Sequence, residues 1–233
     1  MLDKISFEQI LFLDIETVPQ SVSLNQVPED MRELWVKKAK FLSNKEEDTP
    51  ESLYERAGIY AEFGKIVCIS FAKFHDGVLR VKSFYDDNEK VILNQFADLM
   101  QSLKPNILLC AHNGKEFDFP YIARRMLING IALPLALDNA GKKPWEINHL
   151  DTLELWKFGD YKSYTSLVLL AAVFGIPTPK DDIDGSMVAS VYWQEHDLER
   201  IKTYCQKDVI TLAQLILKFK GKPLLEEDKI LYV

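Results

Sequence analysis

The sequence predicts a mixed α/β fold in which a β-sheet is covered by helices. Residues 10–15 form a short apolar run that ends in acidic residues, which is typical of a buried strand. A hairpin is predicted further on, because Asp76-Gly77 separates two β-rich runs and this dipeptide favours a tight turn between strands. From residue 88 onward, helical and strand-like patterns alternate, and the chain closes in helices. This order favours a sheet with helices packed against it.

The boundaries of the elements follow from apolar spacing and from helix-breaking residues. Residues 20–63 are polar and irregular, and they form an expected insertion with an amphipathic helix over 28–42 and a loop over 44–52. The strands predicted after the insertion are 65–74, 78–85, 107–110 and 147–150. The helices predicted after the insertion are 88–103, 117–129, 151–156, 164–174, 186–194 and 197–220.

Length and composition indicate one globular domain over residues 1–233, with the insertion at about 20–63 and a tail at about 221–233. Hydrophobic residues make up 47% of the chain and charged residues 27%, which allows a core of useful size. No signal peptide and no membrane-spanning run is recognised. The cysteines are few, odd in number and widely spaced, which argues against structural zinc and against a disulfide framework. We therefore expect a reducing, cytoplasmic setting.

The net charge is 28 − 35 = −7, which counts against a protein that coats nucleic acid. It does not count against an enzyme that meets a strand only at its end and gathers carboxylates around metal ions. Local basic groups exist, and their simplest interpretation is solvated helix faces and turns. They are Lys37, Lys38, Lys40, Arg124, Arg125, Lys142 and Lys143.

The first candidate site element is the strand that carries Asp14 and Glu16. Side chains two residues apart share a face of a strand, so these two carboxylates point the same way while Leu13 and Ile15 pack on the other side. Two acids at the end of an apolar strand repel each other and lose solvation, and a divalent cation removes that cost. Taken alone, the pair is better explained by solvation at the strand end, because Asp-x-Glu is common by chance.

The second element follows the strand at 107–110 and opens a helix. Asp118 lies near the start of this helix, where an acid is also a good capping residue. Capping alone explains Asp118, but it does not explain the aromatic residues Phe117 and Phe119 on both sides of it.

The third element lies inside the long helix predicted at 197–220. Tyr204 and Asp208 are four residues apart and share one ridge beside the apolar stripe. An acid next to a core face needs a partner. A structural alternative is that Asp208 pairs with a lysine or arginine and that Tyr204 is a boundary aromatic.

Together, the three elements resemble the DEDD exonuclease superfamily, and more narrowly the proofreading exonuclease domain of family B DNA polymerases. The most specific pieces are Asn113-x-x-x-Phe117-Asp118-x-Pro120-Tyr121 and Tyr204-Cys205-x-x-Asp208. The stretches 150–155 and 162–164 with the apolar helix after them are also similar, and the resemblance runs from about residue 11 to 212 apart from the insertion. Position 204 is Tyr, which places the chain in the tyrosine branch. Polymerase motifs have no room in 233 residues.

The resemblance implies a ribonuclease H-like fold and two Mg²⁺ or Mn²⁺ ions held by the acids. Asp14 would bridge both ions, Glu16 and Asp208 would complete the site of one, and Asp118 would serve the other. Hard oxygen ligands suit these ions. Tyr204 would orient the attacking water, because a phenol with a pKa near ~10 is a poor base at neutral pH. The implied activity is a 3′–5′ exonuclease that hydrolyses phosphodiester bonds at the 3′ end of single-stranded DNA and releases nucleoside 5′-monophosphates.

The terminal nucleotide would be held by Thr17 through its backbone, by Asn113 through hydrogen bonds and by Phe117 through stacking, although Phe117 is equally suited to the core. Asp184 could edge the site, but capping the following helix explains it better. His112 and His149 are set aside, because no other His or Cys stands at ligand spacing from either.

Two other functions remain open from the sequence. The first is an RNA-trimming 3′–5′ exonuclease similar to ribonuclease D. RNA and DNA differ at the 2′-hydroxyl, and no residue in the sequence indicates whether the protein contacts that group. The second is a catalytically inactive nucleic-acid-binding scaffold. The loss of a metal-binding acid would indicate a scaffold, but all four acids and the tyrosine are present.

Overall fold

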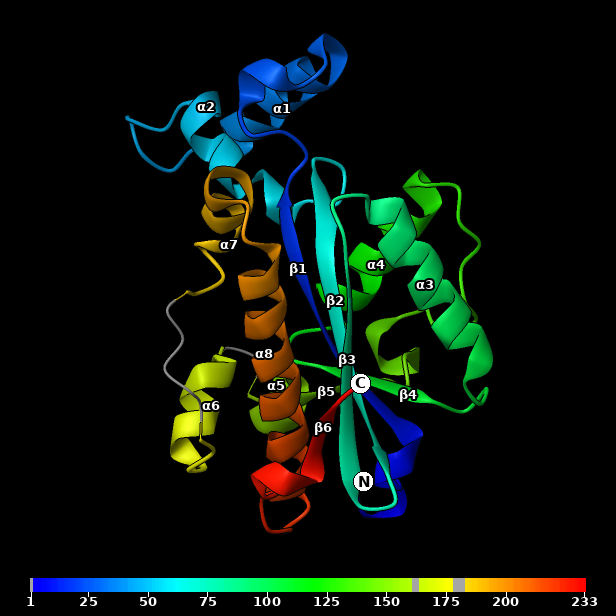
Figure 1. Cartoon of the computed structure of the whole chain (residues 1–233). Helices are drawn as coiled ribbons and strands as arrows, with labels where there is room; N and C mark the ends of the chain where they lie inside the picture. The colour runs from blue at the N-terminus through cyan, green and yellow to red at the C-terminus, as the bar shows by residue number, and fades with distance from the viewer. Residues whose placement is uncertain (1, 161–163, 178–182) are drawn as a thin grey trace.

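A mixed β-sheet forms the centre of the molecule. The computed structural model describes residues 2–160, 164–177 and 183–233. Within these ranges, six strands join in the order β5-β4-β1-β2-β3-β6 (Figure 1). The strands are β1 (Ile10–Pro19), β2 (Gly64–His75), β3 (Val78–Tyr85), β4 (Leu108–Ala111), β5 (Leu150–Asp151) and β6 (Ile230–Tyr232). β1 pairs antiparallel with β2 and parallel with β4, so the predicted mixed sheet is confirmed.

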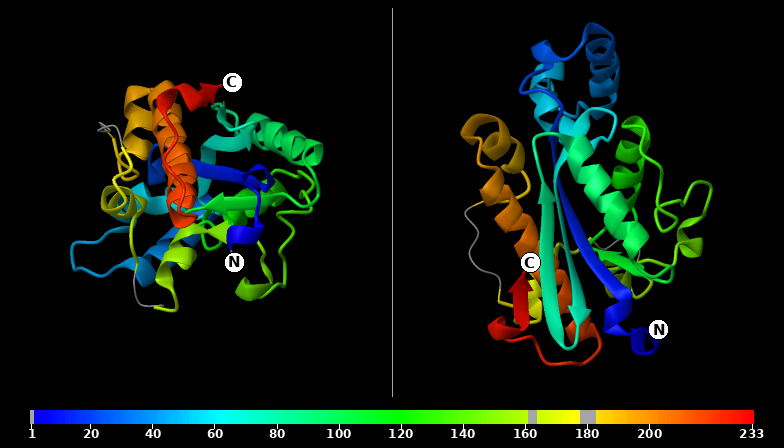
Figure 2. Two further views of the ribbon diagram at one scale, coloured as in Figure 1. Left: turned by 90° about the horizontal axis from the view of Figure 1, so that it is seen from below. Right: turned by 45° about the vertical axis from the view of Figure 1, so that its right-hand side comes forward.

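Helices lie on both sides of the sheet (Figure 2). α8 packs on one face, and α3 and α4 pack on the other. The helices are α1 (Glu29–Leu42), α2 (Pro50–Leu53), α3 (Glu89–Ser102), α4 (Asp118–Ile128), α5 (Thr152–Lys157), α6 (Leu167–Val173), α7 (Val188–Ser190) and α8 (Leu198–Phe219). In the part of the chain that the structure describes, no helix has the length and apolarity needed to cross a membrane.

The alternation of side chains along β1 decides which groups face α8. Leu11, Leu13 and Ile15 enter the apolar cluster formed with α3 and α4. Ile10 and Phe12 enter the cluster formed with α8. Asp14 continues this second row, and it contacts α8 directly. The pleat of one buried strand therefore directs the first carboxylates toward the long helix, as the sequence predicts.

The hairpin between β2 and β3 turns at the predicted dipeptide. Asp76 and Gly77 both have positive φ, at 50° and 75°, and His75 pairs directly with Val78. This is the backbone that a two-residue hairpin loop with right-handed strand twist requires.

Several predicted boundaries differ from the structure, each for a local reason. The helix expected from 164 starts only at Leu167, because the side chain of Ser166 caps it by accepting a hydrogen bond from the Leu169 N–H. The helix expected over 186–194 is a short α7 followed by a π-helical turn over Val191–Glu195. The loop expected over 44–52 ends in α2, which Thr49 caps. β6 was not predicted, and it extends the sheet beside β3. Residues 162–163 of the similar stretch lie outside the described residues.

The segment 20–63 packs around an aromatic cluster at one end of the molecule, beyond the carboxyl end of β1 (Figure 1). The fully buried Trp35 lies at its centre, and its indole N–H donates to the Pro50 carbonyl at 2.8 Å. Gly58 lies so close to β1 that a Cβ there would meet the Val18 carbonyl carbon at 2.9 Å. The Tyr121 hydroxyl of α4 donates to the Gly58 carbonyl at 2.7 Å. The segment is thereby fixed to the strand and the helix that carry candidate site residues.

A buried ion pair joins α3 to α4. The Arg125 guanidinium donates to both carboxylate oxygens of Glu89, at 2.8 and 2.5 Å, and both side chains are under 10% exposed. Arg125 also donates to the Ala61 carbonyl, while Glu89 accepts from the Ile66 N–H. Arg125 is therefore a buried cross-link, whereas its neighbour Arg124 is exposed as the sequence predicts.

We predict that Arg125→Ala lowers the free energy of unfolding by about 3–5 kcal/mol, because it leaves the Glu89 carboxylate buried without its cation. Urea denaturation followed by circular dichroism measures the effect. Arg124→Ala is the matched control and should change stability by less than about 0.5 kcal/mol. Equal, small effects of both substitutions would show that the ion pair does not stabilise the fold.

Candidate active site

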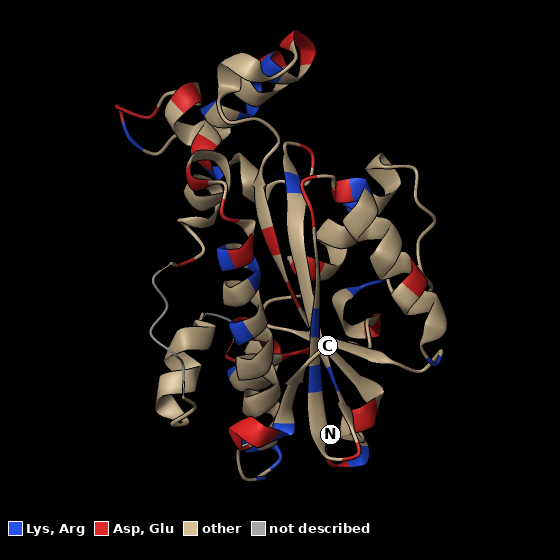
Figure 3. Cartoon of the chain, in the orientation of Figure 1, with Lys and Arg blue, Asp and Glu red and all other residues tan. Residues whose placement is uncertain are grey.

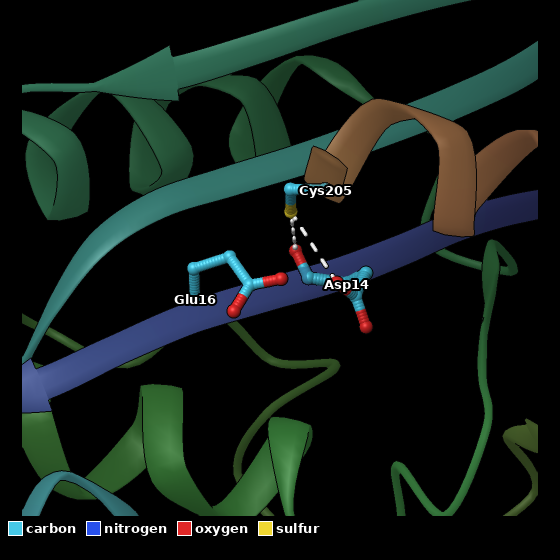
Figure 4. A group of neighbouring side chains, drawn as sticks. All are labelled: Asp14, Glu16 and Cys205. Atoms are coloured by element: carbon cyan, nitrogen blue, oxygen red, sulfur yellow. Dashed lines mark hydrogen bonds between the residues drawn. The ribbon is translucent and has the colours of Figure 1, made fainter. Parts of the chain in front are cut away.

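Two carboxylates from β1 and one thiol from α8 meet at the centre of the candidate site (Figure 4). The thiol of Cys205 donates to the Asp14 carboxylate at 3.3 Å and approaches the Asp14 carbonyl at 3.5 Å. One ligand atom from each of Asp14, Glu16 and Cys205 lies within 4.8 Å of the others. Glu16 is 8% exposed, and Cys205 is fully buried. β1 and α8 therefore enclose the polar side chains of Asp14, Glu16 and Cys205 within an otherwise apolar interface.

The carboxylates of this region raise one another's pKa. Burial raises the pKa of Asp14 well above its ordinary value, and the charges of Asp118 and Asp208 raise it further. Burial also raises the pKa of Glu16, followed by the charges of Asp14 and Asp208. The three elements β1, α4 and α8 thus bring the four predicted acids into electrostatic contact. Ionising four neighbouring carboxyl groups costs free energy, and a positive charge bound between them would offset this cost.

Asp118 is the first residue of α4, and its side chain is directed to β1. The pKa of Asp118 rises to about 7, mainly through burial, although hydrogen bonds from its own N–H and from the Ile15 N–H lower it. Ile15 lies between the two acids of β1. The predicted capping role is not observed, because Phe117 is the N-cap residue and no side-chain cap bond is formed there. The carboxylate instead joins the start of α4 to the acidic strand.

Tyr204 and Asp208 lie one turn apart on α8 and are both partly buried. The Tyr204 hydroxyl is hydrogen bonded to the Asp208 carboxylate. Burial raises the pKa of Tyr204 strongly, and the charges of Asp208, Glu16 and Asp14 add to the effect. The phenol is therefore neutral at physiological pH and can donate a hydrogen bond.

The three predicted nucleotide-binding residues lie in β1, in the turn after β4 and at the start of α4. Thr17 follows Glu16 at an irregularity in the β1–β2 register, and Tyr121 is hydrogen bonded to it. Asn113 adopts a positive φ of 63° in the turn after β4. Phe117 is partly buried, with its ring 5.3 Å from that of Tyr121, and it packs against the core. The core alternative for Phe117 therefore has direct support.

Asp151 is a site-supporting residue whose role sequence patterns alone do not reveal. Its buried carboxylate accepts hydrogen bonds from the N–H groups of Asn113 and Lys115, at 2.9 and 3.1 Å, and from the Leu153 N–H at 2.9 Å. It thereby fixes the loop that precedes Asp118. The available signal was an acid at the end of a strand, directly before a helical turn, in the stretch 150–155.

The residues set aside from the sequence are satisfied by other contacts. His112 contacts the Thr152 hydroxyl and donates to the Thr165 carbonyl, both at 2.9 Å. His149 accepts from the Leu109 N–H and donates to the Ala136 carbonyl. Asp184 is exposed and accepts from the Ser186 N–H at 2.8 Å, so it forms a local turn before α7.

Comparison with known proteins identifies the family of this chain and solved structures with the same fold. The family described as "Predicted 3'-5' exonuclease related to the exonuclease domain of PolB" matches residues 59–223. A solved family B DNA polymerase from the archaeon Pyrobaculum calidifontis has the same fold over 90% of this chain and 24% of its own, with a TM-score of 0.53 and 17% identity.

Archaeal DNA polymerases are similar in sequence over part of their length. The DNA polymerase of Pyrococcus glycovorans is 24% identical over 188 residues, which cover 72% of this chain and 24% of the relative. The DNA polymerase of Thermococcus sp. (strain GE8) is 25% identical over 188 residues, which cover 72% of this chain and 11% of the relative. The chain thus spans a quarter or less of these relatives. It belongs to the family of predicted 3′–5′ exonucleases related to the exonuclease domain of PolB.

Proposed function

We propose that the chain is a two-metal-ion 3′–5′ exonuclease that acts on the 3′ end of single-stranded DNA. It hydrolyses phosphodiester bonds and releases nucleoside 5′-monophosphates. The observation that carries the proposal is the convergence of Asp14, Glu16, Asp118 and Asp208, since burial and neighbouring acidic charges raise the pKa of the first three. The family to which the chain belongs supports the same reaction.

The donor set fits Mg²⁺ or Mn²⁺, because all four groups offer hard carboxylate oxygens. Burial also makes the ionised forms of Asp14 and Glu16 costly unless positive charge is bound nearby. Asp14 and Glu16 would hold the ions from β1, Asp118 from α4 and Asp208 from α8. When bound, two such ions stabilise the attacking and leaving oxygens of an in-line displacement at phosphorus.

Tyr204 acts in this proposal by orienting the attacking water. Its raised pKa keeps the hydroxyl protonated, so it does not remove a proton from the water. Since the hydroxyl donates its proton to the Asp208 carboxylate, its oxygen would accept a hydrogen bond from the water. Asp208 fixes the hydroxyl from one turn further along α8.

The terminal nucleotide would be held on the side of β1 and α4. Thr17 offers backbone groups next to Glu16, and Asn113 offers its amide from a turn that Asp151 fixes. Phe117 offers the free part of a ring that also packs on the core. Basic and acidic residues are interspersed along α8 and the segment 20–63 (Figure 3), which suits contact with a strand end better than coating of a long polymer. We further propose a reducing, cytoplasmic setting, which the free cysteines support.

Digestion of 5′-labelled single-stranded DNA, with 3′-labelled DNA and 5′-labelled RNA in parallel, tests the proposed reaction. We expect a ladder that shortens from the 3′ end with Mg²⁺ or Mn²⁺ and not with EDTA, and faster cleavage of DNA than of RNA. Asp14→Ala should slow cleavage by about a hundredfold or more, because a bound metal contributes several kcal/mol to catalysis.

Asp138→Ala is the matched control for the loss of one carboxylate, since Asp138 is exposed and outside the site. It should cleave at the rate of the unchanged protein. Preferential cleavage of RNA would assign the chain to RNA trimming. Failure of well-folded protein to cleave either polymer would favour the scaffold function.

Tyr204→Phe should slow cleavage less than Asp14→Ala does. It removes one hydrogen bond to water, which corresponds to about 10–100-fold in rate, and leaves the carboxylates in place. Single-turnover cleavage at saturating Mg²⁺ measures both variants. An equal loss in the two variants would show that Tyr204 does more than orient the water.

A further inference from the structure

The thiol of Cys205 lies among the carboxylates in a way that the proposed Mg²⁺ chemistry does not use. Its sulfur is 3.3 Å from the Asp14 carboxylate, and it shares a sphere of 4.8 Å with ligand atoms of Asp14 and Glu16 (Figure 4). Hard cations such as Mg²⁺ prefer oxygen, so the thiol stays protonated beside them and serves as a hydrogen-bond donor to Asp14. Softer divalent cations bind sulfur directly.

Glu16 gives a second indication of a cation site. Its side chain is more than nine-tenths buried and its carboxylate points into the group formed with Asp14 and Cys205. Among the described residues, neither a hydrogen bond nor a basic side chain lowers the pKa of this carboxylate. A buried carboxylate without a partner is costly, and a bound cation would satisfy it.

The spacing of the three donors suits a small tetrahedral ion. With metal–oxygen distances of about 2.0 Å and metal–sulfur distances of about 2.3 Å, neighbouring ligand atoms of a tetrahedral zinc site lie roughly 3.3–3.8 Å apart. The sulfur and the Asp14 oxygen already have this separation. Only a small movement of the Glu16 side chain would complete three ligands.

We propose that Asp14, Glu16 and the Cys205 thiolate form an inhibitory site for thiophilic divalent cations such as Zn²⁺. The Cys205 proton passes to solvent as the sulfur–metal bond forms, and no oxidant or reductant takes part. The fourth position is open to water or to Cys68, which pairs with Glu16 across the strands and is hydrogen bonded to Cys205. Since Asp14 and Glu16 would then be occupied, Zn²⁺ inhibits cleavage. That consequence rests on the proposed nuclease function, whereas the ligand set does not.

Titration of EDTA-treated protein with Cd²⁺ and with Co²⁺ tests the ligand set directly. Thiolate coordination produces a sulfur-to-metal charge-transfer absorption, which carboxylates do not give. We expect this absorption to saturate at one equivalent and to persist in excess Mg²⁺. Cys205→Ser should abolish it and weaken Cd²⁺ binding, measured by calorimetry, by at least about tenfold, since it removes a direct ligand.

Cys110→Ser is the matched control, because Cys110 is an equally buried cysteine in the apolar cluster of β4 and α8. It should keep the absorption. Cys205→Ala provides a second variant if the serine disturbs folding, which thermal melting detects. An absorption that persists in both Cys205 variants, or its absence from the unchanged protein, would overturn the proposal.

Zn²⁺ inhibition provides the functional readout. At a fixed Mg²⁺ concentration, the Zn²⁺ concentration that halves the cleavage rate should be at least about tenfold higher for Cys205→Ser than for Cys110→Ser, in proportion to the lost affinity. A protein that shows the absorption but cleaves no nucleic acid would contradict the proposed function and leave the thiophilic site established. Cleavage by a protein that shows no absorption would support the proposed function and contradict the thiophilic site.

Discussion

The mutual repulsion of four carboxylates, two of them buried and two partly buried, is the constraint on which the rest of the site depends. Asp14 and Glu16 come from β1, Asp118 from α4 and Asp208 from α8, and burial together with their charges raises the pKa of the first three. A fold gains nothing from such an arrangement unless positive charge is added, because each acid loses solvation and repels the others. The apolar faces of β1 and α8 hold the acids in place despite this cost.

Support for the site comes from residues that touch no metal or substrate. Asp151 gathers the N–H groups of the loop before α4, and the Ile15 N–H holds the Asp118 carboxylate against β1. Arg125 and Glu89 fix the far end of α4 to α3. These contacts hold backbone and side chains in one geometry, which is the condition for precise placement of ligands. The site is therefore an outcome of the packed sheet and not of a mobile loop.

Local periodicity was sufficient to predict the parts of the site that lie on regular elements. The two-residue repeat of β1 places Asp14 with Glu16, and the four-residue spacing of α8 places Tyr204 with Asp208. Cys205 is recognisable in the sequence as part of the motif Tyr204-Cys205-x-x-Asp208. Its contact with Asp14 could not be predicted, because it joins residues 191 positions apart. Asp151 was missed for the same reason. β6 was missed because a short exposed strand carries little pattern and depends on pairing with β3.

Binding of a divalent cation by the four carboxylates is tested most directly by measuring the melting temperature as a function of pH, with and without Mg²⁺. Asp14, Glu16 and Asp118 have raised pKa values, about 7 for Asp118, so the folded state binds more protons than the unfolded state above about pH 4. Metal-free protein should therefore lose stability as pH rises from 5 to 8. Mg²⁺ should restore it most at pH 8, and Asp118→Asn should weaken both effects. A melting temperature that is unchanged or higher at pH 8, and insensitive to Mg²⁺, would show that these carboxylates do not form a divalent-cation site.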